Sequence, residues 1–277
     1  MESITSRQNP LILKVVRLRE RKHRQREQLF SFDGIKLCKE AIQSEIPLEK
    51  IFLRASSATR VLERMNQELA GIQFEEHPGL VMLEDSVFEK ISEEKSPEGI
   101  ICIAKYIDKC HKIVTINNEG NISEYPASLD ERIMLLESVR DPGNLGTIIR
   151  SAAAFGIDRV ILSDDCADLY NAKTVRASMG TIFRQKIDRV DHMPSAVQAL
   201  RAQGRRIFAT ALDNTAVRLG SVSLEKHDGI VIGNEGHGLS AETIAACTGC
   251  LFIPMAEGIE SLNAAMAATV CMWEMFR

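Results

Sequence analysis

Three short loops of the sequence combine glycine with amide or carboxylate side chains, and each joins an apolar run to a predicted helix. They span Glu137–Arg150, Ile232–Ser240 and Ile253–Asn263. Such loops expose backbone N–H groups and let a ligand come close to the main chain. Turn formation and helix capping would explain one such loop equally well. Three of them at the same end of one sheet favour a binding site.

Apolar runs of strand length alternate with helical stretches in the second half of the chain. This order predicts a mostly parallel sheet covered on both faces, with ligands bound beyond the carboxyl ends of its strands. The predicted strands are Ile133–Glu137, Arg159–Leu162, Gln185–Ile187, Arg206–Thr210, Gly229–Gly233 and Cys250–Ile253. The predicted helices are Gly146–Phe155, Ala172–Ser178, Pro194–Gln203, Ala241–Ala246 and one from Asn263 to the end.

The chain is predicted to form two α/β domains, a small one over residues 1–105 and a larger one over residues 132–277. Residues 106–131 are rich in Asn, Gly, Pro and Ser, which favour turns, and are predicted to be a linker with one strand at Lys112–Ile116. The elements predicted in the small domain are strands at Leu29–Phe32, Lys50–Leu53 and Gly99–Ala104 and helices at Gly34–Ser44, Ala58–Gln67 and Val87–Ile91.

Charge is distributed unevenly along the 277 residues. The formal net charge is −4, yet the first 30 residues hold eight basic and three acidic residues, so the remainder carries −9. A basic stretch of this kind is either a solvated helix face or an arm that contacts phosphates of a nucleic acid. The predicted phosphate contacts are Arg7, Lys14, Arg17, Arg21, Lys22 and Arg24.

Several common signatures are absent from the sequence. The glycine fingerprint of dinucleotide-binding folds and the P-loop are both missing, which disfavours a nicotinamide oxidoreductase or a P-loop enzyme. Cys247 and Cys250 lack a second pair of ligands, so no metal site is predicted and packing explains both. His237 has no serine-elbow motif beside it, and we expect a local role in its loop.

The sequence also favours a cytoplasmic protein with no membrane partner. Its seven cysteines are scattered, unlike a secreted disulfide framework, and its start lacks an apolar signal core. The longest apolar stretch, Ala264–Trp273, is shorter than the about 20 residues that a membrane-spanning helix needs.

The three loops resemble the signature motifs of the SpoU/TrmH family of RNA ribose 2′-O-methyltransferases, in the SPOUT superfamily. Asn144–Arg150, within Asp-Pro-Gly-Asn-Leu-Gly-Thr-Ile-Ile-Arg, resembles the first motif, and Gly233-Asn-Glu-Gly-His-Gly-Leu239 the second. Ile253-Pro-Met through Ser261-Leu-Asn263 resembles the third. Val175–Gly180 is similar to the family's Ser-x-Gly turn.

The resemblance extends to the first domain. Four segments are similar to the family's N-terminal substrate-binding domain, which resembles an RNA-binding ribosomal-protein α/β fold. They are Ser6–Pro10, the basic stretch that follows it within the first 30 residues, Phe32-Asp33-Gly34 and Ser96–Ile100. Asp33 stands where the family usually has Glu, and Glu98 where it often has Gln.

The resemblance implies a deep trefoil knot in the catalytic domain, S-adenosylmethionine bound in a bent pose, and a homodimer with the site near its interface. It implies methyl transfer to a ribose 2′-hydroxyl, with ribosomal RNA favoured as substrate. Transfer RNA is an alternative substrate. A catalytically silent RNA-binding protein on the same scaffold is an alternative of another class, and a dinucleotide oxidoreductase is the third.

The resemblance also implies roles for individual residues. Arg150 stands at the catalytic position; because a guanidinium stays protonated, we expect it to bind the phosphate beside the target ribose and favour the developing alkoxide. Glu235 would orient Arg150 or accept the proton. The predicted catalytic residues are Asn144, Arg150, Glu235, Ser261 and Asn263. The predicted cofactor-binding residues, which act mainly through backbone groups, are Thr210, Gly233, Ile253 and Leu262.

Overall fold

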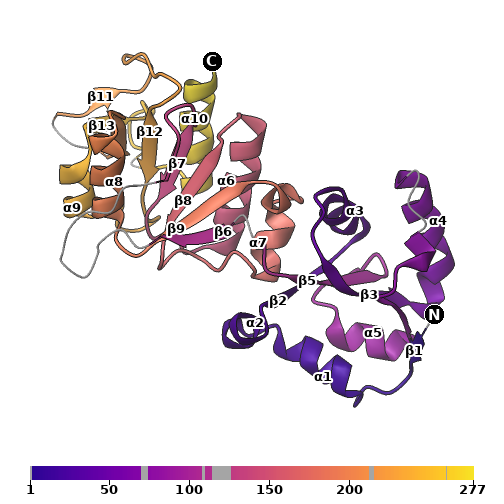
Figure 1. Cartoon of the computed structure of the whole chain (residues 1–277). Coiled ribbons are helices and arrows are strands. Elements are labelled where there is room, and N and C mark those ends of the chain that lie inside the picture. Colours follow the sequence, from indigo (N-terminus) through magenta and orange to yellow (C-terminus); the bar gives the residue numbers. More distant parts are fainter. Residues whose placement is uncertain (1, 70–73, 108–109, 114–125, 212–214, 260) are drawn as a thin grey trace. The chain divides into compact units, whose positions relative to one another are not determined.

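The computed structural model describes residues 2–69, 74–107, 110–113, 126–211, 215–259 and 261–277. By their internal contacts these residues divide into two compact units (Figure 1). Unit 1 comprises residues 1–107 and 168–184, and unit 2 comprises residues 108–167 and 185–277.

Unit 1 is built on a five-stranded sheet with the strand order β1-β4-β3-β5-β2. Its strands are β1 (Glu2–Ile4), β2 (Leu29–Asp33), β3 (Leu48–Arg54), β4 (Leu80–Leu83) and β5 (Ile100–Lys105). Its helices are α1 (Pro10–Arg17), α2 (Arg21–Glu27), α3 (Ile35–Gln43), α4 (Ala58–Glu68), α5 (Asp85–Ile91) and α7 (Ala172–Ala177), with 3-10 turns η1 (Ala55–Ser57), η2 (Phe74–Glu76) and η3 (Thr181–Phe183).

Helices α1 and α5 lie against one face of this sheet, and α3 and α4 lie against the other (Figure 1). The start of α1 is set by Asn9, whose side chain accepts from the Leu11 N–H at 2.9 Å, and by Pro10, whose fixed backbone angle suits the first helical position. Ile12 and Val15 are buried in the core beneath α1. The basic residues of α1 and α2 that are not buried are therefore left on the outer surface.

The segment 168–184 returns from the second half of the sequence and packs entirely within unit 1. Arg24 of α2 forms an ion pair with Asp168 at 2.5 Å, with both side chains largely buried. Tyr170 stacks on Tyr106 with 3.8 Å between the ring centroids. By sequence this segment falls in the predicted domain 132–277, whereas its packing partners in the structure belong to unit 1.

We expect Arg24→Leu to lower the free energy of unfolding by about 3 kcal/mol, because it leaves the Asp168 carboxylate without its buried partner. It also removes donors to the carbonyls of Leu18 and Arg19, which the guanidinium now contacts at 2.6 and 2.7 Å. Urea unfolding measures the change. Arg26→Leu is the matched control, since Arg26 pairs with its neighbour on the surface. Equal losses from the two variants would contradict a structural role for Arg24.

Unit 2 is built on an eight-stranded sheet with the order β11-β13-β10-β12-β7-β8-β9-β6, and every ladder between its described strands is parallel. Its strands are β6 (Cys110–Ile113), β7 (Ile133–Leu136), β8 (Arg159–Ser163), β9 (Lys186–Val190), β10 (Ile207–Thr210), β11 (Val217–Arg218), β12 (Gly229–Ile232) and β13 (Gly249–Phe252). Its helices are α6 (Pro142–Ala154), α8 (Met193–Ala202), α9 (Ala241–Ala246) and α10 (Ala264–Phe276).

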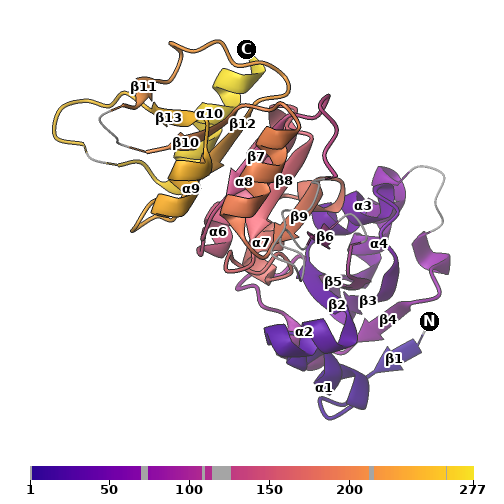
Figure 2. The same ribbon diagram turned by 60° about the vertical axis from the view of Figure 1, so that its left-hand side comes forward.

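Helices cover both faces of this sheet, α8 and α9 on one side and α6 and α10 on the other (Figures 1 and 2). All four residues of β7 and of β12 are buried, as expected for central parallel strands. Ile133 and Leu135 pack in the core beneath α8, so their neighbours along β7 point to the opposite face. The predicted α/β fold with a parallel sheet is confirmed by this arrangement, and the trefoil knot stays a prediction.

Helix α6 begins four residues earlier than the predicted helix Gly146–Phe155. Asp141 caps it by accepting from the Asn144 N–H at 2.9 Å, and Pro142 takes the first helical position. Asp141–Asn144, whose residue types suggest a loop turn in the sequence, therefore form the cap and the first turn of α6. As a result, Asn144 projects from that turn instead of from a loop.

The short strands β1, β4 and β11 were not predicted, because two to four residues carry too little alternation to be distinguished from loops. Most of the predicted linker 106–131 lies outside the described residues. Within it, Cys110–Ile113 forms strand β6, which pairs with β9 of unit 2. The strand predicted at Lys112–Ile116 overlaps β6, and its last three residues lie outside the described part of the chain.

Candidate active site

The three glycine loops follow strands of one parallel sheet and therefore leave it at the same edge. The first follows β7 and the second follows β12, which is paired with β7. The third follows β13, which is separated from β12 by β10 alone. Parallel strands end on the same side, so residues distant in the sequence meet there.

Asn144 joins the three loops through its side-chain amide. Its Nδ2 donates to Glu235 Oε1 at 2.9 Å, and its Oδ1 accepts from Asn263 Nδ2 at 3.0 Å. The Asn263 Oδ1 accepts from the N–H groups of Ala265 and Met266 and so caps α10. Asn263 thus fixes the start of α10, and the two asparagines together with Glu235 bring one residue of each loop into a single cluster.

The second loop has a defined shape that presents Glu235 at its tip. Asn234 and Gly238 form an antiparallel bridge across it, and Asn234 Oδ1 accepts from the N–H groups of Gly236 and His237. A Cβ atom on Gly233 would lie 2.4 Å from the backbone carbon of Gly238, so only glycine fits there. His237 takes part in this loop through its backbone N–H, and the local role expected of its side chain stays a prediction.

Two predicted catalytic residues lie outside this hydrogen-bonded cluster. Arg150 is exposed on α6, about 1.7 turns beyond Asn144, and among the described residues it forms no ion pair. Ser261 is exposed just before Asn263. The structure thus brings Asn144, Glu235 and Asn263 together and leaves Arg150 free to reach an anionic ligand.

The predicted cofactor residues follow strands at the same edge of the sheet. Thr210 ends β10 and donates through its hydroxyl to the Val231 carbonyl at 2.8 Å. Ile253 follows β13 and is partly buried, while Leu262 is 40% exposed. An exposed apolar side chain can cover an aromatic base, and the backbone N–H and C=O groups of a loop can bind the hydrogen-bonding edge of that base. These residues are therefore compatible with the predicted S-adenosylmethionine site, and their contacts with the cofactor stay a prediction.

Two residues that support the first loop were missed in the sequence. Ser138 adopts a left-handed backbone conformation (φ 57°), which is uncommon outside glycine. Its N–H donates to Ser163 Oγ at 2.9 Å, and its hydroxyl donates to Asp165 at 2.5 Å. Asp165 follows β8, which carries no glycine motif, so no pattern in the sequence pointed to it. Such strain, held by neighbours, is common beside functional sites.

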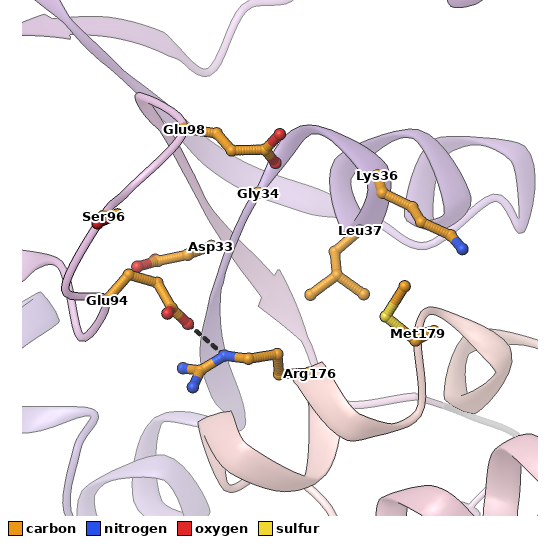
Figure 3. A pocket seen from close by; sticks show the side chains of 9 residues that line it. All are labelled: Asp33, Gly34, Lys36, Leu37, Glu94, Ser96, Glu98, Arg176 and Met179. Atoms are coloured by element: carbon orange, nitrogen blue, oxygen red, sulfur yellow. Dashed lines mark ion pairs between the residues drawn. The ribbon is translucent and has the colours of Figure 1, made fainter.

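Unit 1 has a separate hollow at the start of α3 (Figure 3). Glu98 reaches across it to accept from the Ile35 N–H at 2.8 Å, and Glu94 pairs with Arg176. Burial raises the pKa of Asp33 to about 6. The carboxylates of Glu94 and Glu98 therefore link segments of unit 1 at this hollow. Its lining residues are Asp33, Gly34, Lys36, Leu37, Glu94, Ser96, Glu98, Arg176 and Met179.

The predicted phosphate contacts differ in exposure. Arg7, Arg17, Arg21 and Lys22 are exposed. Lys14 is partly buried and pairs with Glu27 at 3.2 Å. Arg24 is 4% exposed and forms an ion pair with Asp168, so its guanidinium stabilises unit 1 and is covered from solvent.

Within the described residues there is no group of His, Cys, Asp and Glu side chains arranged to hold a metal ion. No described helix has the length and apolarity to cross a membrane.

Residues 131–273, just over half of the chain, match the model of the SpoU rRNA methylase family. The chain belongs to this family. Residues 9–102 match the MRM3-like substrate binding domain, which covers most of unit 1 of this SpoU methyltransferase. The predicted family is therefore confirmed, and with it the class of RNA 2′-O-methyltransferases that use S-adenosylmethionine.

Relatives resemble this SpoU methyltransferase over its whole length. The 23S rRNA (guanosine(2553)-2′-O)-methyltransferase RlmP of Bacillus subtilis is 30% identical over 99% of both chains. A crystal structure of an RNA 2′-O ribose methyltransferase matches with a TM-score of 0.79 and 26% identity, covering 99% of this chain and 97% of that one. An AdoMet-bound rRNA methyltransferase from Sinorhizobium meliloti matches with a TM-score of 0.77 and 26% identity, at the same coverage.

Proposed function

We propose that this SpoU methyltransferase methylates a ribose 2′-hydroxyl of ribosomal RNA at the edge where β7, β12 and β13 end. The observation that carries the proposal is the amide of Asn144, which joins Glu235 and Asn263. Ribosomal RNA is favoured over transfer RNA because the relative of equal length, RlmP, is named for a guanosine of 23S rRNA. The RNA substrate and the bacterial relative suggest the cytoplasm as its location.

The residues at this edge divide the work of the reaction. S-adenosylmethionine supplies an electrophilic methyl group, so the ribose oxygen bonds the methyl carbon as the carbon–sulfur bond breaks and the hydroxyl proton leaves. Arg150 binds the adjacent phosphate and stabilises the developing alkoxide. Glu235 accepts the proton, since its carboxylate is exposed beside Asn144. Asn144 and Asn263 orient the ribose, and Ser261 contributes a hydroxyl near the methyl group.

The cofactor in this proposal is held by the loops after β10, β12 and β13. Gly233 and Ile253 offer backbone groups, Thr210 ends β10, and Leu262 covers the base with its exposed apolar side chain. Among these four, Gly233 also has a structural requirement for glycine, because a Cβ would collide with Gly238. A substitution there would disturb the loop as well as the cofactor.

Methyl transfer from tritiated S-adenosylmethionine to purified ribosomal RNA and to bulk transfer RNA tests the proposal. We expect label in ribosomal RNA, at one 2′-O-methyl site found by mapping. Label in transfer RNA alone would favour the alternative substrate. RNA binding without label in either would favour a silent RNA-binding protein.

We also propose that the protein is a homodimer that buries the outer face of α10. Met266, Val270 and Trp273 lie on that face at helical spacing and are 65%, 40% and 52% exposed. Phe155, directly after α6, packs edge-on against Trp273 with 5.9 Å between the ring centroids and extends the apolar surface. Exposed apolar side chains gathered on one helix face are typical of a protein–protein interface.

We expect Trp273→Glu to convert the protein to a monomer, because it would bury a charge in each half of the interface. Sedimentation velocity measures the assembly, and circular dichroism checks that the variant is folded. Val217→Glu is the matched control, an exposed apolar residue on β11 that lies outside this face. A dimer that survives Trp273→Glu would show that another surface forms the interface.

A further inference from the structure

Glu137 is a buried carboxylate that the proposed chemistry does not use. It follows β7 and is 9% exposed. Its Oε2 accepts from the Ser240 N–H at 2.9 Å, and its Oε1 accepts from Ser240 Oγ at 2.9 Å and Thr243 Oγ1 at 2.7 Å. Three donors on one buried carboxylate hold it in a fixed position.

The same residue also holds the other end of the second loop. The Glu137 N–H donates to the carbonyl of Ile232, the last residue of β12, at 2.9 Å. Ser240 lies at the start of α9, where the loop ends. Glu137 therefore binds the loop where it leaves the sheet, through its backbone, and where it enters α9, through its side chain.

A third contact fastens the middle of the loop to the residue after Glu137. Asn234 Nδ2 donates to the Ser138 carbonyl at 2.8 Å. The loop that carries Glu235 is thus tied at both ends and near its tip to the end of β7. The position of Glu235 against Asn144 depends on these ties, and a displacement of about 1 Å at a catalytic group can slow a reaction strongly.

We propose that Glu137 is a positioning residue for methyl transfer, which closes the loop Gly233–Ser240 and so holds Glu235 against Asn144. This inference rests on the proposed function of the site. It predicts that loss of the Glu137 carboxylate acts through Glu235, and that an acceptor at the same place restores the effect.

The principal test compares Glu137→Met with Glu131→Met in steady-state methyl transfer to ribosomal RNA. Both carboxylates are 9% exposed, and they stand at opposite ends of β7. Glu131 pairs with Arg159 and Lys186, away from the loop. We expect kcat to fall at least about tenfold for Glu137→Met, with KM for RNA within about twofold, and to change less than about twofold for Glu131→Met. Equal kcat losses would overturn the proposal.

A conservative variant and a double-mutant cycle separate positioning from general destabilisation. Glu137→Gln should recover most of kcat, because its amide oxygen can accept from Ser240 N while its NH₂ donates to the two hydroxyls. In a Glu235→Ala background, adding Glu137→Met should lower kcat less than about threefold further. An undiminished loss in that background would show that Glu137 does not act through Glu235.

Two further measurements cover failure to fold and failure of the proposed function. If Glu137→Met does not fold, Thr243→Val removes one donor to the carboxylate with little change of shape, and should lower kcat only when Glu235 is present. Hydrogen exchange needs no activity: the Ser240 amide should exchange at least about tenfold faster in Glu137→Met than in Glu131→Met, and Glu137→Gln, which keeps an acceptor for that N–H, should restore most of the protection. Unchanged exchange would overturn the proposal even if RNA is methylated. Faster exchange without RNA methylation would leave the loop role standing and refute the proposed function.

Discussion

Replacing Arg150 with alanine should reduce methyl transfer on the order of 1000-fold, the size of effect expected when a group that stabilises a developing oxyanion is removed. Arg150 is exposed on α6 and unpaired among the described residues, so its loss should not destabilise unit 2. The predicted cofactor residues lie on other elements, after β10, β12 and β13. S-adenosylmethionine binding, measured by calorimetry, should therefore change less than about twofold.

Two companion variants sharpen this prediction. Arg150→Lys should rescue poorly, because an ammonium cannot offer the paired donors that a guanidinium presents to a phosphate. Arg218→Ala removes another exposed arginine of unit 2 and should keep full activity. A folded Arg150→Ala protein that no longer binds S-adenosylmethionine would contradict the assigned role. Full activity of Arg150→Lys would contradict recognition by paired donors.

The residue types of the site could be predicted from the sequence, but their partners could not. Asn144, Glu235 and Asn263 stand in three motifs spread over about 120 residues, and the parallel strand order brings them within hydrogen-bond distance. Asp165 was missed as a supporting residue because it lies outside the glycine loops. Glu137 begins the first of these loops, but nothing in the loop points to the partners of its carboxylate. Their importance depends on burial and on hydrogen-bond partners that become neighbours when the sheet forms.

The same limit explains Arg24. In the sequence it is one of several basic residues on a predicted helix, and the helical spacing of apolar and polar residues does not show that Arg24 is buried while Arg21 and Lys22 are exposed. The structure turns it inward to Asp168, which lies 144 residues later in the chain. An interaction over that separation leaves no local pattern, so only the fold distinguishes the arginine that packs from those that face solvent.

Deleting the first 30 residues would be a poor test of the basic arm, because it would also remove Ile12, Val15 and Leu18 from the core of unit 1. Substitution of exposed residues avoids this. Arg17, Arg21 and Lys22 are exposed on or beside α1 and α2, and none is needed for the core. They offer a way to remove charge while the fold is kept.

The triple variant Arg17→Ala, Arg21→Ala, Lys22→Ala should weaken RNA binding on the order of 100-fold near physiological salt. The plot of log affinity against log salt concentration should become shallower by about 2 to 3 in slope, because binding releases about one counterion fewer for each phosphate contact that is removed. Filter binding over a salt series measures both. The control variant Lys36→Ala, Arg60→Ala, Lys95→Ala removes the same charge from exposed positions of unit 1 outside α1 and α2. If both variants lower affinity and slope equally, net charge and not a basic arm governs RNA binding.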